Sequence, residues 1–290
     1  MADERDFTVA GIRPQEASPP PPRPPWYRGR PVLAWAVLAV LVLGCLSWEL
    51  WLPGDPGRID LGRASSPPGE GLWFGADLLG RDIFAMIWAG GRTSLAVGFA
   101  AGALSAALGL VLGALGGLAP RGAGAALSRC VEIFLSVPQL LAVMLLLGAL
   151  DRTGAPALTL ALALGLTSWP GLARVAAQET RRLRASGYVE ASRTMGGGFF
   201  HILRRHLAPG CFPAVMFMAV MNVRSAIAAE AALSFLGLGL PVEAVSWGSM
   251  LALSERALLG GGWWMIVIPG AFLTGTLLCL TEIGNSFRRG

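Results

Sequence analysis

Six long apolar segments constrain this chain more than any other feature. They lie at residues 31–52, 93–119, 129–150, 156–176, 212–238 and 263–281. A helix needs about 20 residues to cross the hydrocarbon core of a bilayer, and these segments have about that length or more. Because no water inside a bilayer can satisfy a free backbone N–H or C=O group, such segments must be helices. The sequence therefore predicts an all-α integral membrane protein with six transmembrane helices.

Composition supports the same fold class. Charged residues make up only 14% of the 290 residues, compared with roughly 25% in an average soluble domain. In the fourth segment, Trp169-Pro170-Gly171 predicts a kink. In the second segment, small residues predict close contact between helices. These residues are Gly98, Gly102, Gly109, Gly113 and Gly117.

Arginine alone can indicate orientation, because the chain contains no lysine. If the N-terminus is cytoplasmic, sixteen arginines fall on the cytoplasmic side and six on the opposite side. This bias satisfies the positive-inside rule with both termini cytoplasmic. The net charge of +5 is then explained by topology and by anionic membrane lipid, so we do not expect nucleic acid as a partner.

The same reading divides the chain into four regions. Residues 1–30 form a Pro/Arg-rich cytoplasmic tail that we expect to be disordered, although a proline-rich ligand for another protein is an alternative. Residues 31–52 form the first transmembrane helix, and 53–92 form an external loop. Residues 93–290 form a core domain with five transmembrane helices, and this domain includes a cytoplasmic loop at 177–210.

Several kinds of chemistry are excluded by the residues present. A phosphate-binding Walker loop and a Schiff base both require lysine. The cysteines Cys45, Cys130, Cys211 and Cys279 fall in different spans without C-x-x-C spacing. His201 and His206 are five residues apart and do not share a helix face at i, i+4. We therefore expect no catalytic residue, no metal site and no cofactor.

The cytoplasmic stretch 188–209 combines arginines with apolar residues between two apolar spans. Glu190-Ala191-Ser192, Gly196 six residues after the Glu, and Pro209 thirteen further on predict a helix, a glycine turn, a second helix and a stop. Such a helix pair on the cytoplasmic face indicates a docking partner.

The external loop carries a second motif, formed by Gly75, Asp77, Gly80, Arg81 and Asp82. The two glycines are expected to flank turns, Asp77 to cap a following helical turn, and Arg81 and Asp82 to pair locally. Catalysis by Asp77 and Asp82 would need a second polar constellation that the chain lacks. We therefore interpret this motif as a structured loop at the outer mouth.

Three charged residues fall inside predicted spans: Glu132, Arg224 and Glu230. Charge within a membrane usually faces a cavity or a protein partner and marks a pathway. Pairing with a neighbouring helix for assembly is the equally weighted alternative for Arg224 and Glu230.

The 188–209 stretch resembles the "EAA" coupling loop of permease subunits of ABC-type importers, which has Glu-Ala-Ala, a Gly six residues on and a Pro near the end. Its ending, His206-Leu207-Ala208-Pro209, is similar to that of the dipeptide/oligopeptide/nickel branch. Ser192, Ala76 and Ala208 depart from the usual Ala, Thr and Leu. Further similar motifs are Phe74 to Asp82, Glu230 to Gly239 and Ser246 to Leu251.

This resemblance implies the type I ABC importer permease fold, in its C-type form, in the bacterial cytoplasmic (inner) membrane. The implied partners are a homologous B-type permease in a heterodimer, two ATP-binding subunits that hydrolyse ATP, an external substrate-binding protein and membrane lipid. The implied cargo is a di- or oligopeptide, with nickel or a metal chelate as the alternative. An ion-coupled secondary transporter is the alternative of another class, although no internal repeat supports it. The implied coupling residues are Glu190, Ala191, Gly196, Phe199, Phe200, Leu203, Arg204, Arg205, His206 and Pro209. The resemblance also implies that an ATP-binding subunit is contacted by an apolar anchor (Phe199, Phe200, Ile202, Leu203, Leu207) and a charged rim (Arg193, Arg204, Arg205).

Overall fold

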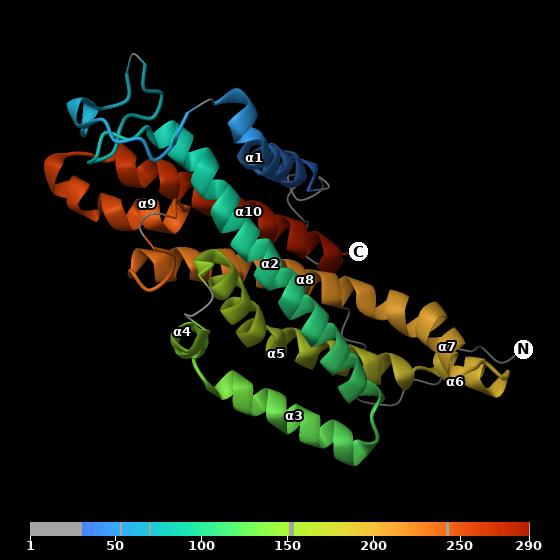
Figure 1. Cartoon of the computed structure of the whole chain (residues 1–290). Helices are drawn as coiled ribbons and strands as arrows, with labels where there is room; N and C mark the ends of the chain where they lie inside the picture. Colours follow the sequence, from blue (N-terminus) through green and yellow to red (C-terminus); the bar gives the residue numbers. More distant parts are fainter. Residues whose placement is uncertain (1–30, 53, 70, 151–153, 242–243, 290) are drawn as a thin grey trace, which may run out of the picture. The chain divides into compact units, whose positions relative to one another are not determined.

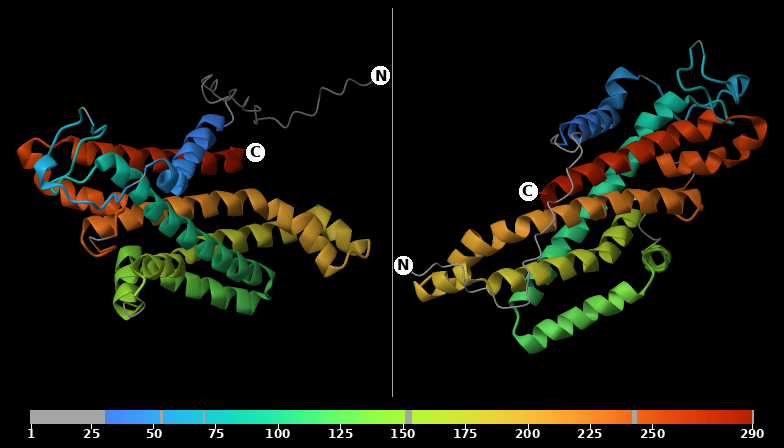
Figure 2. Two further views of the ribbon diagram at one scale, coloured as in Figure 1. Left: turned by 45° about the horizontal axis from the view of Figure 1, so that its top comes forward. Right: turned by 180° about the vertical axis from the view of Figure 1, so that it is seen from behind.

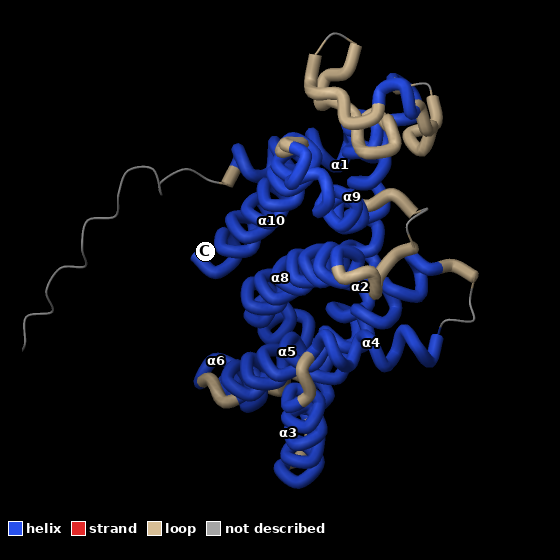
Figure 3. The backbone as a smooth tube through the Cα atoms, turned by 90° about the vertical axis from the view of Figure 1, so that its left-hand side faces the viewer, coloured by secondary structure: helices blue, strands red, loops and turns tan. Residues whose placement is uncertain are grey.

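A computed structural model describes residues 31–52, 54–69, 71–150, 154–241 and 244–289, and these residues form helices and loops without a strand (Figures 1 and 3). The first half contains α1 (Val32–Trp51), α2 (Ile83–Leu118), α3 (Arg121–Ser136), α4 (Gln139–Leu150) and α5 (Pro156–Arg184). The second half contains α6 (Gly187–Thr194), α7 (Phe199–Ile202), α8 (Ala208–Phe235), α9 (Trp247–Ser254) and α10 (Trp264–Arg289). Shorter turns lie at Leu61–Arg63, Leu203–Leu207 and Glu255–Gly260. The predicted tail, residues 1–30, lies outside the described residues.

Five helices in the described part of the chain are long and apolar enough to cross a membrane. They are Val32–Trp51, Ile83–Leu118, Pro156–Arg184, Leu203–Phe235 and Trp264–Arg288. A sixth crossing is present if α3 and α4, which are bent by 88° at their junction, form one span. The all-helical prediction is confirmed, and the six predicted segments correspond to these five helices and the bent pair.

The structure has a break in the third segment that the sequence did not predict, and the kink at Pro170 stays a prediction. Helix α5 continues through Pro170, whereas α3 and α4 are separated at Val137 and Pro138. A residue before proline is disfavoured in the helical region, and the β-branched Val137 adopts an extended backbone (φ −87°, ψ 126°). Packing of α5 along α2 favours the helical conformation at Pro170 despite its missing N–H.

Helix α2 begins ten residues before the predicted span, so the loop that was predicted to be external ends at Asp82 and not at residue 92. The Asp82 side chain accepts a hydrogen bond from Phe84 N (2.9 Å) and caps the helix. Glycines then allow α2 to lie against two other helices, as predicted. A Cβ on Gly113 would come within 2.5 Å of Ala173 O on α5, and a Cβ on Gly98 would collide with the Ile227 side chain on α8.

Two apolar clusters surround α2. One cluster joins α2 to α1, α8, α9 and α10, with Ile87, Ile227 and Trp247 fully buried. The other joins α2 to α4, α5 and α8 through residues such as Val143 and Leu164. Burial of this kind against small residues stabilises helix packing in the absence of a hydrophobic driving force in lipid.

The long helices separate two ends of residues 31–289. The loop between α1 and α2 lies with α9 at one end, where α2 and α10 begin. Helices α6 and α7 lie at the other end, where α5 ends and α8 begins (Figures 1 and 2). The two sequence motifs are therefore at opposite ends of the helices.

Candidate functional site

The first candidate site is the segment Gly187–Leu207, here called the coupling segment. Helix α6 ends at a turn in which Gly197 N donates to Ser192 O (2.8 Å). Gly196 has a φ of +85°, a conformation that residues with a Cβ rarely adopt. The predicted helix, glycine turn and second helix are confirmed by this geometry.

The predicted stop at Pro209 is wrong. Helix α7 continues through a π-helical turn, Leu203–Leu207, directly into α8. Because Pro209 has no N–H, it cannot satisfy the carbonyl four residues before it. The wider turn, in which Ala208 N donates to Leu203 O, is a known way of accommodating such an interruption. Helix α7, the π-helical turn and α8 thus form one continuous helical rod, whereas α6 is separated from it by the glycine turn.

The inner face of the coupling segment is apolar. Val189, Ile202 and Leu207 are at most 5% exposed and pack with Leu183 of α5 and Cys211 of α8. Ile202 and Leu207 were expected to contact a partner, but they instead join the segment to its own spans. Their burial holds α6 against the start of α8.

The outer face of the coupling segment is left to solvent. Glu190, Ala191, Arg204, Arg205 and Pro209 are exposed, while His206 and Leu203 are partly buried. Sequence reasoning missed Tyr188 and Met195, which are 50% and 81% exposed. Large apolar residues flanking the Glu-Ala-Ser start were the available signal. The side chains of Arg193, Phe199 and Phe200 lie outside the described set.

Two arginines connect this end of the molecule to α2. The last carbonyls of a helix have no partner within it, and Arg184 Nη1 donates to Leu118 O (2.7 Å). Arg181 Nη2 donates to Gly116 O and to Gly124 O (both 3.1 Å). The end of α5 is therefore bonded to the C-terminus of α2 and to the start of α3.

The motif of the predicted external loop folds around a buried ion pair. Asp77 and Arg81 are 8% and 7% exposed, and Asp77 Oδ2 accepts from Arg81 Nε (2.7 Å) and Nη2 (2.6 Å). Asp77 Oδ1 accepts from the backbone N–H of Leu79 (2.9 Å) and of Arg81 (2.8 Å). Arg81 pairs with Asp77 and not with Asp82 as predicted, because Asp82 caps α2.

The two glycines of this motif occupy turns, as predicted. Gly75 and Gly80 have φ values of +78° and +75°. A Cβ on Gly80 would collide with Asp60 O, and Trp264 Nε1 of α10 donates to Ala76 O (3.3 Å). The motif therefore holds the loop between α1 and α2 against the starts of α2 and α10.

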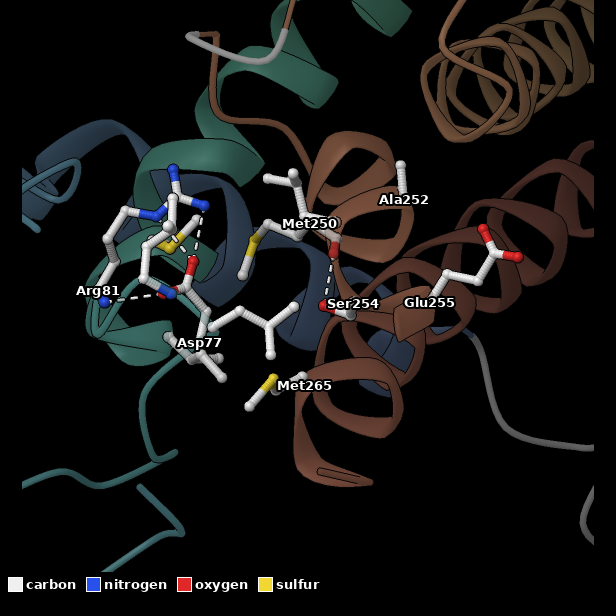
Figure 4. A pocket seen from close by; sticks show the side chains of 12 residues that line it. Asp77, Arg81, Met250, Ala252, Ser254, Glu255 and Met265 are labelled. Atoms are coloured by element: carbon white, nitrogen blue, oxygen red, sulfur yellow. Dashed lines mark hydrogen bonds and ion pairs between the residues drawn. The ribbon is translucent and has the colours of Figure 1, made fainter. Parts of the chain in front are cut away.

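A cavity of about 390 Å³ lies beside this ion pair. Figure 4 shows Asp77 and Arg81 on one side and Met250 and Ser254 of α9 on the other. The ion pair is satisfied internally, and Ser254 Oγ donates to Met250 O (2.6 Å). The polar groups of Asp77, Arg81 and Ser254 are therefore used within the fold.

The three intramembrane charges lie in different surroundings. Glu132 is half-exposed on α3 and pairs with Arg129 (3.3 Å). Glu230 is fully buried and accepts from Ser234 Oγ (3.0 Å). Arg224 is partly buried, and its Nε has no hydrogen-bond partner among the described residues. A role in a pathway stays a prediction for all three.

The remaining sequence motifs meet where α8, α9 and α2 join. Trp247 is fully buried, with its N–H and Nε1 donating to Ser94 Oγ (3.2 Å) and Ile87 O (3.0 Å) of α2. Ser246 and Ser249 form a capping box at the start of α9. A Cβ on Gly248 would lie 2.6 Å from Ala231 Cα of α8. These motif residues build a helix junction.

Comparison with known proteins gives consistent similarities. A family model described as "Binding-protein-dependent transport system inner membrane component" matches residues 109–283. A Brucella ovis protein named as a peptide permease is 37% identical over 258 residues, covering 89% of this chain and 84% of that protein. The dipeptide transport system permease protein DppC of Bacillus subtilis is 34% identical over 80% of this chain and 71% of its own length. The oligopeptide transport system permease protein OppC of the same organism is 31% identical over 87% and 81%.

A similar solved structure is a chain of the MetNI methionine ABC transporter in an inward-facing conformation. It has a TM-score of 0.56 at 20% identity and covers 70% of this chain and 94% of that chain. At this identity the likeness concerns the fold.

Proposed function

This chain belongs to the family of binding-protein-dependent transport system inner membrane components, and from that premise we propose that it forms the translocation pathway of an ATP-driven importer of di- and oligopeptides. Its fold is the type I ABC importer permease fold. The observation that carries the proposal is the coupling segment, a helix pair with an exposed outer face whose second helix runs directly into a membrane span. The ion-coupled secondary transporter is set aside on family membership.

The proposed cargo follows the relatives. Proteins at least 31% identical to this chain are named for dipeptide, oligopeptide or other peptide transport, so peptides are preferred over nickel or a metal chelate. Selection among peptides would be made mainly by an external binding protein. Membership of this family also supports two ATP-binding subunits and a homologous permease as partners. It supports a bacterial inner-membrane location as well.

The proposed mechanism is a conformational gate without covalent chemistry in this chain. ATP-binding subunits would hold the outer face of the coupling segment through Tyr188, Met195 and the exposed Arg204 and Arg205. Aromatic and arginine side chains commonly dominate such interfaces. Because the segment continues into α8 and packs on α5, its displacement would be passed to both spans as a rigid-body motion. Arg181 and Arg184 would extend that motion to α2.

Uptake in a reconstituted system tests this function. The chain is combined in proteoliposomes with a second permease, the ATP-binding subunits and a binding protein of the same organism. We expect a labelled tripeptide to accumulate only when ATP and the binding protein are both present, and omission of this chain to abolish uptake. Accumulation driven by an ion gradient without ATP would contradict the proposal.

We also propose that the coupling segment and both termini are cytoplasmic, because ATP is there and the arginines are concentrated on that side. Cysteines placed at Leu61 (71% exposed) and Met195 (81% exposed), in a background without the four native cysteines, provide the test. We expect an impermeant thiol reagent to label the Leu61→Cys protein in intact cells, and the Met195→Cys protein only after lysis. Labelling of both in intact cells would mean that α3 and α4 do not cross as one span.

A further inference from the structure

A groove of about 670 Å³ lies where α4, α5 and α8 meet, next to the α3–α4 break. Its polar lining consists of Gln139, Thr167, Ser168, Asn222 and Ser225, set among apolar residues such as Leu166. We call it the midspan groove. Its volume falls within the range of about 300–1,000 Å³ that is usual for ligand pockets.

The polar side chains of the midspan groove come from the middle of the spans. Asn222 lies at the centre of α8, Ser168 lies close to the centre of α5, and Gln139 directly follows the break between α3 and α4. Gln139 Nε2 donates to Ser168 Oγ (2.8 Å), and Asn222 Nδ2 donates to Ser168 O (3.4 Å). Three segments distant in sequence thus bring amide and hydroxyl groups to one depth.

Several hydrogen-bonding groups of the groove have no partner among the described residues. Asn222 Nδ2 also donates to Ser105 Oγ on α2 (2.6 Å), but no described residue donates to Asn222 Oδ1 or to Gln139 Oε1. Ser225 Oγ has no hydrogen-bond partner among the described residues either. Lipid chains cannot satisfy such groups, so the groove suits a polar occupant such as water or a peptide backbone.

The lining is also uncharged. None of the described residues that line the groove is Asp, Glu, Lys or Arg. A fixed charge at this depth would attract one class of charged peptide and repel the other. Neutral amides and hydroxyls can instead bond the backbone N–H and C=O groups that every peptide carries.

We propose that the midspan groove is the part of the pathway that contacts the backbone of the passing peptide, and that its neutrality lets acidic and basic peptides pass alike. Ser225 is the residue on which this can be tested, because its hydroxyl makes no bond that holds the fold together. The proposal rests on the proposed function, since it requires that peptides are the cargo.

The test compares Ser225→Asp with Ser225→Asn in the reconstituted transporter. The two side chains have nearly the same volume and differ in charge. Uptake is measured for two tripeptides that differ only in a central Glu or Lys, each supplied at a concentration that saturates the binding protein. For Ser225→Asp we expect the Glu/Lys uptake ratio to fall about tenfold, a change of about 1.4 kcal/mol in relative barrier. For Ser225→Asn the ratio should stay at the wild-type value.

An unchanged ratio in Ser225→Asp, with normal uptake by the wild type, would overturn the groove assignment and leave the proposed function intact. Absence of peptide uptake by the wild type would instead overturn the proposed function. If Ser225→Asp fails to assemble, Ser225→Cys in the cysteine-free background replaces it, modified with a cationic or an anionic thiol reagent of equal size. The anionic adduct should lower the Glu/Lys ratio relative to the cationic adduct. A Ser225→Cys side chain that neither reagent modifies, during transport or at rest, would place the groove outside the pathway and overturn the proposal.

Discussion

A Gly196→Val substitution is expected to lower peptide-dependent ATP hydrolysis and uptake by at least about tenfold, while the protein still inserts into the membrane. Gly196 has a φ of +85°, and a Cβ there would meet no atom within 4 Å. The effect must therefore come from the backbone, because the left-handed conformation costs a residue with a Cβ about 1–2 kcal/mol. A valine would shift the turn and with it the angle between α6 and α7. The measurement is ATPase activity and uptake in the reconstituted transporter.

Two controls separate the effect of backbone strain from the effect of added side-chain volume. Gly187→Val adds the same side chain to the same segment, also with no atom within 4 Å and without a positive φ, and it should retain wild-type activity. Gly196→Asn should be milder than Gly196→Val, because Asn tolerates the left-handed region. Equal losses in Gly187→Val and Gly196→Val would show that the glycine turn has no special part in coupling.

An Asp77→Asn substitution is expected to destabilise the external loop strongly. It removes the carboxylate that pairs with Arg81 and leaves a cation that is 7% exposed without its partner. Breaking a buried pair from one side typically costs about 3–5 kcal/mol. We expect a clear fall in the melting temperature of the detergent-purified transporter. Thermal unfolding is monitored by the fluorescence of the buried tryptophans.

The chain supplies a matched control and a rescue. Asp60→Asn removes the same charge from the Arg63–Asp60 pair, whose side chains are 61% and 50% exposed, and exposed pairs contribute about 0–1 kcal/mol. Asp77→Asn with Arg81→Met removes both charges and should recover part of the lost stability. Similar melting temperatures for Asp60→Asn and Asp77→Asn would refute the importance of the buried pair.

Much of this protein was determined by its sequence alone. The apolar segments had to be helices because a bilayer offers backbone groups no other partner. A turn at Gly196 could be predicted because glycine readily adopts a positive φ. The motifs at 74–82, 190–209 and 230–251 also indicated the family. These features depend on a residue and its near neighbours, or on the solvent that all spans share.

Other features were decided only by tertiary structure. Pro138 interrupts a helix while Pro170 does not, and Arg81 pairs with Asp77 although Asp82 is adjacent. Ile202 turns inward onto Val189, and Gln139, Ser168 and Asn222 meet at one depth. Each outcome depends on which distant helix faces pack together. Sequence periodicity gives every helix its apolar surface, but in a chain this rich in apolar residues nearly every face is apolar. Which helices pack together is decided by small residues, such as the glycines of α2, and by the few polar side chains. The partners of these residues are identified only when the helices are packed.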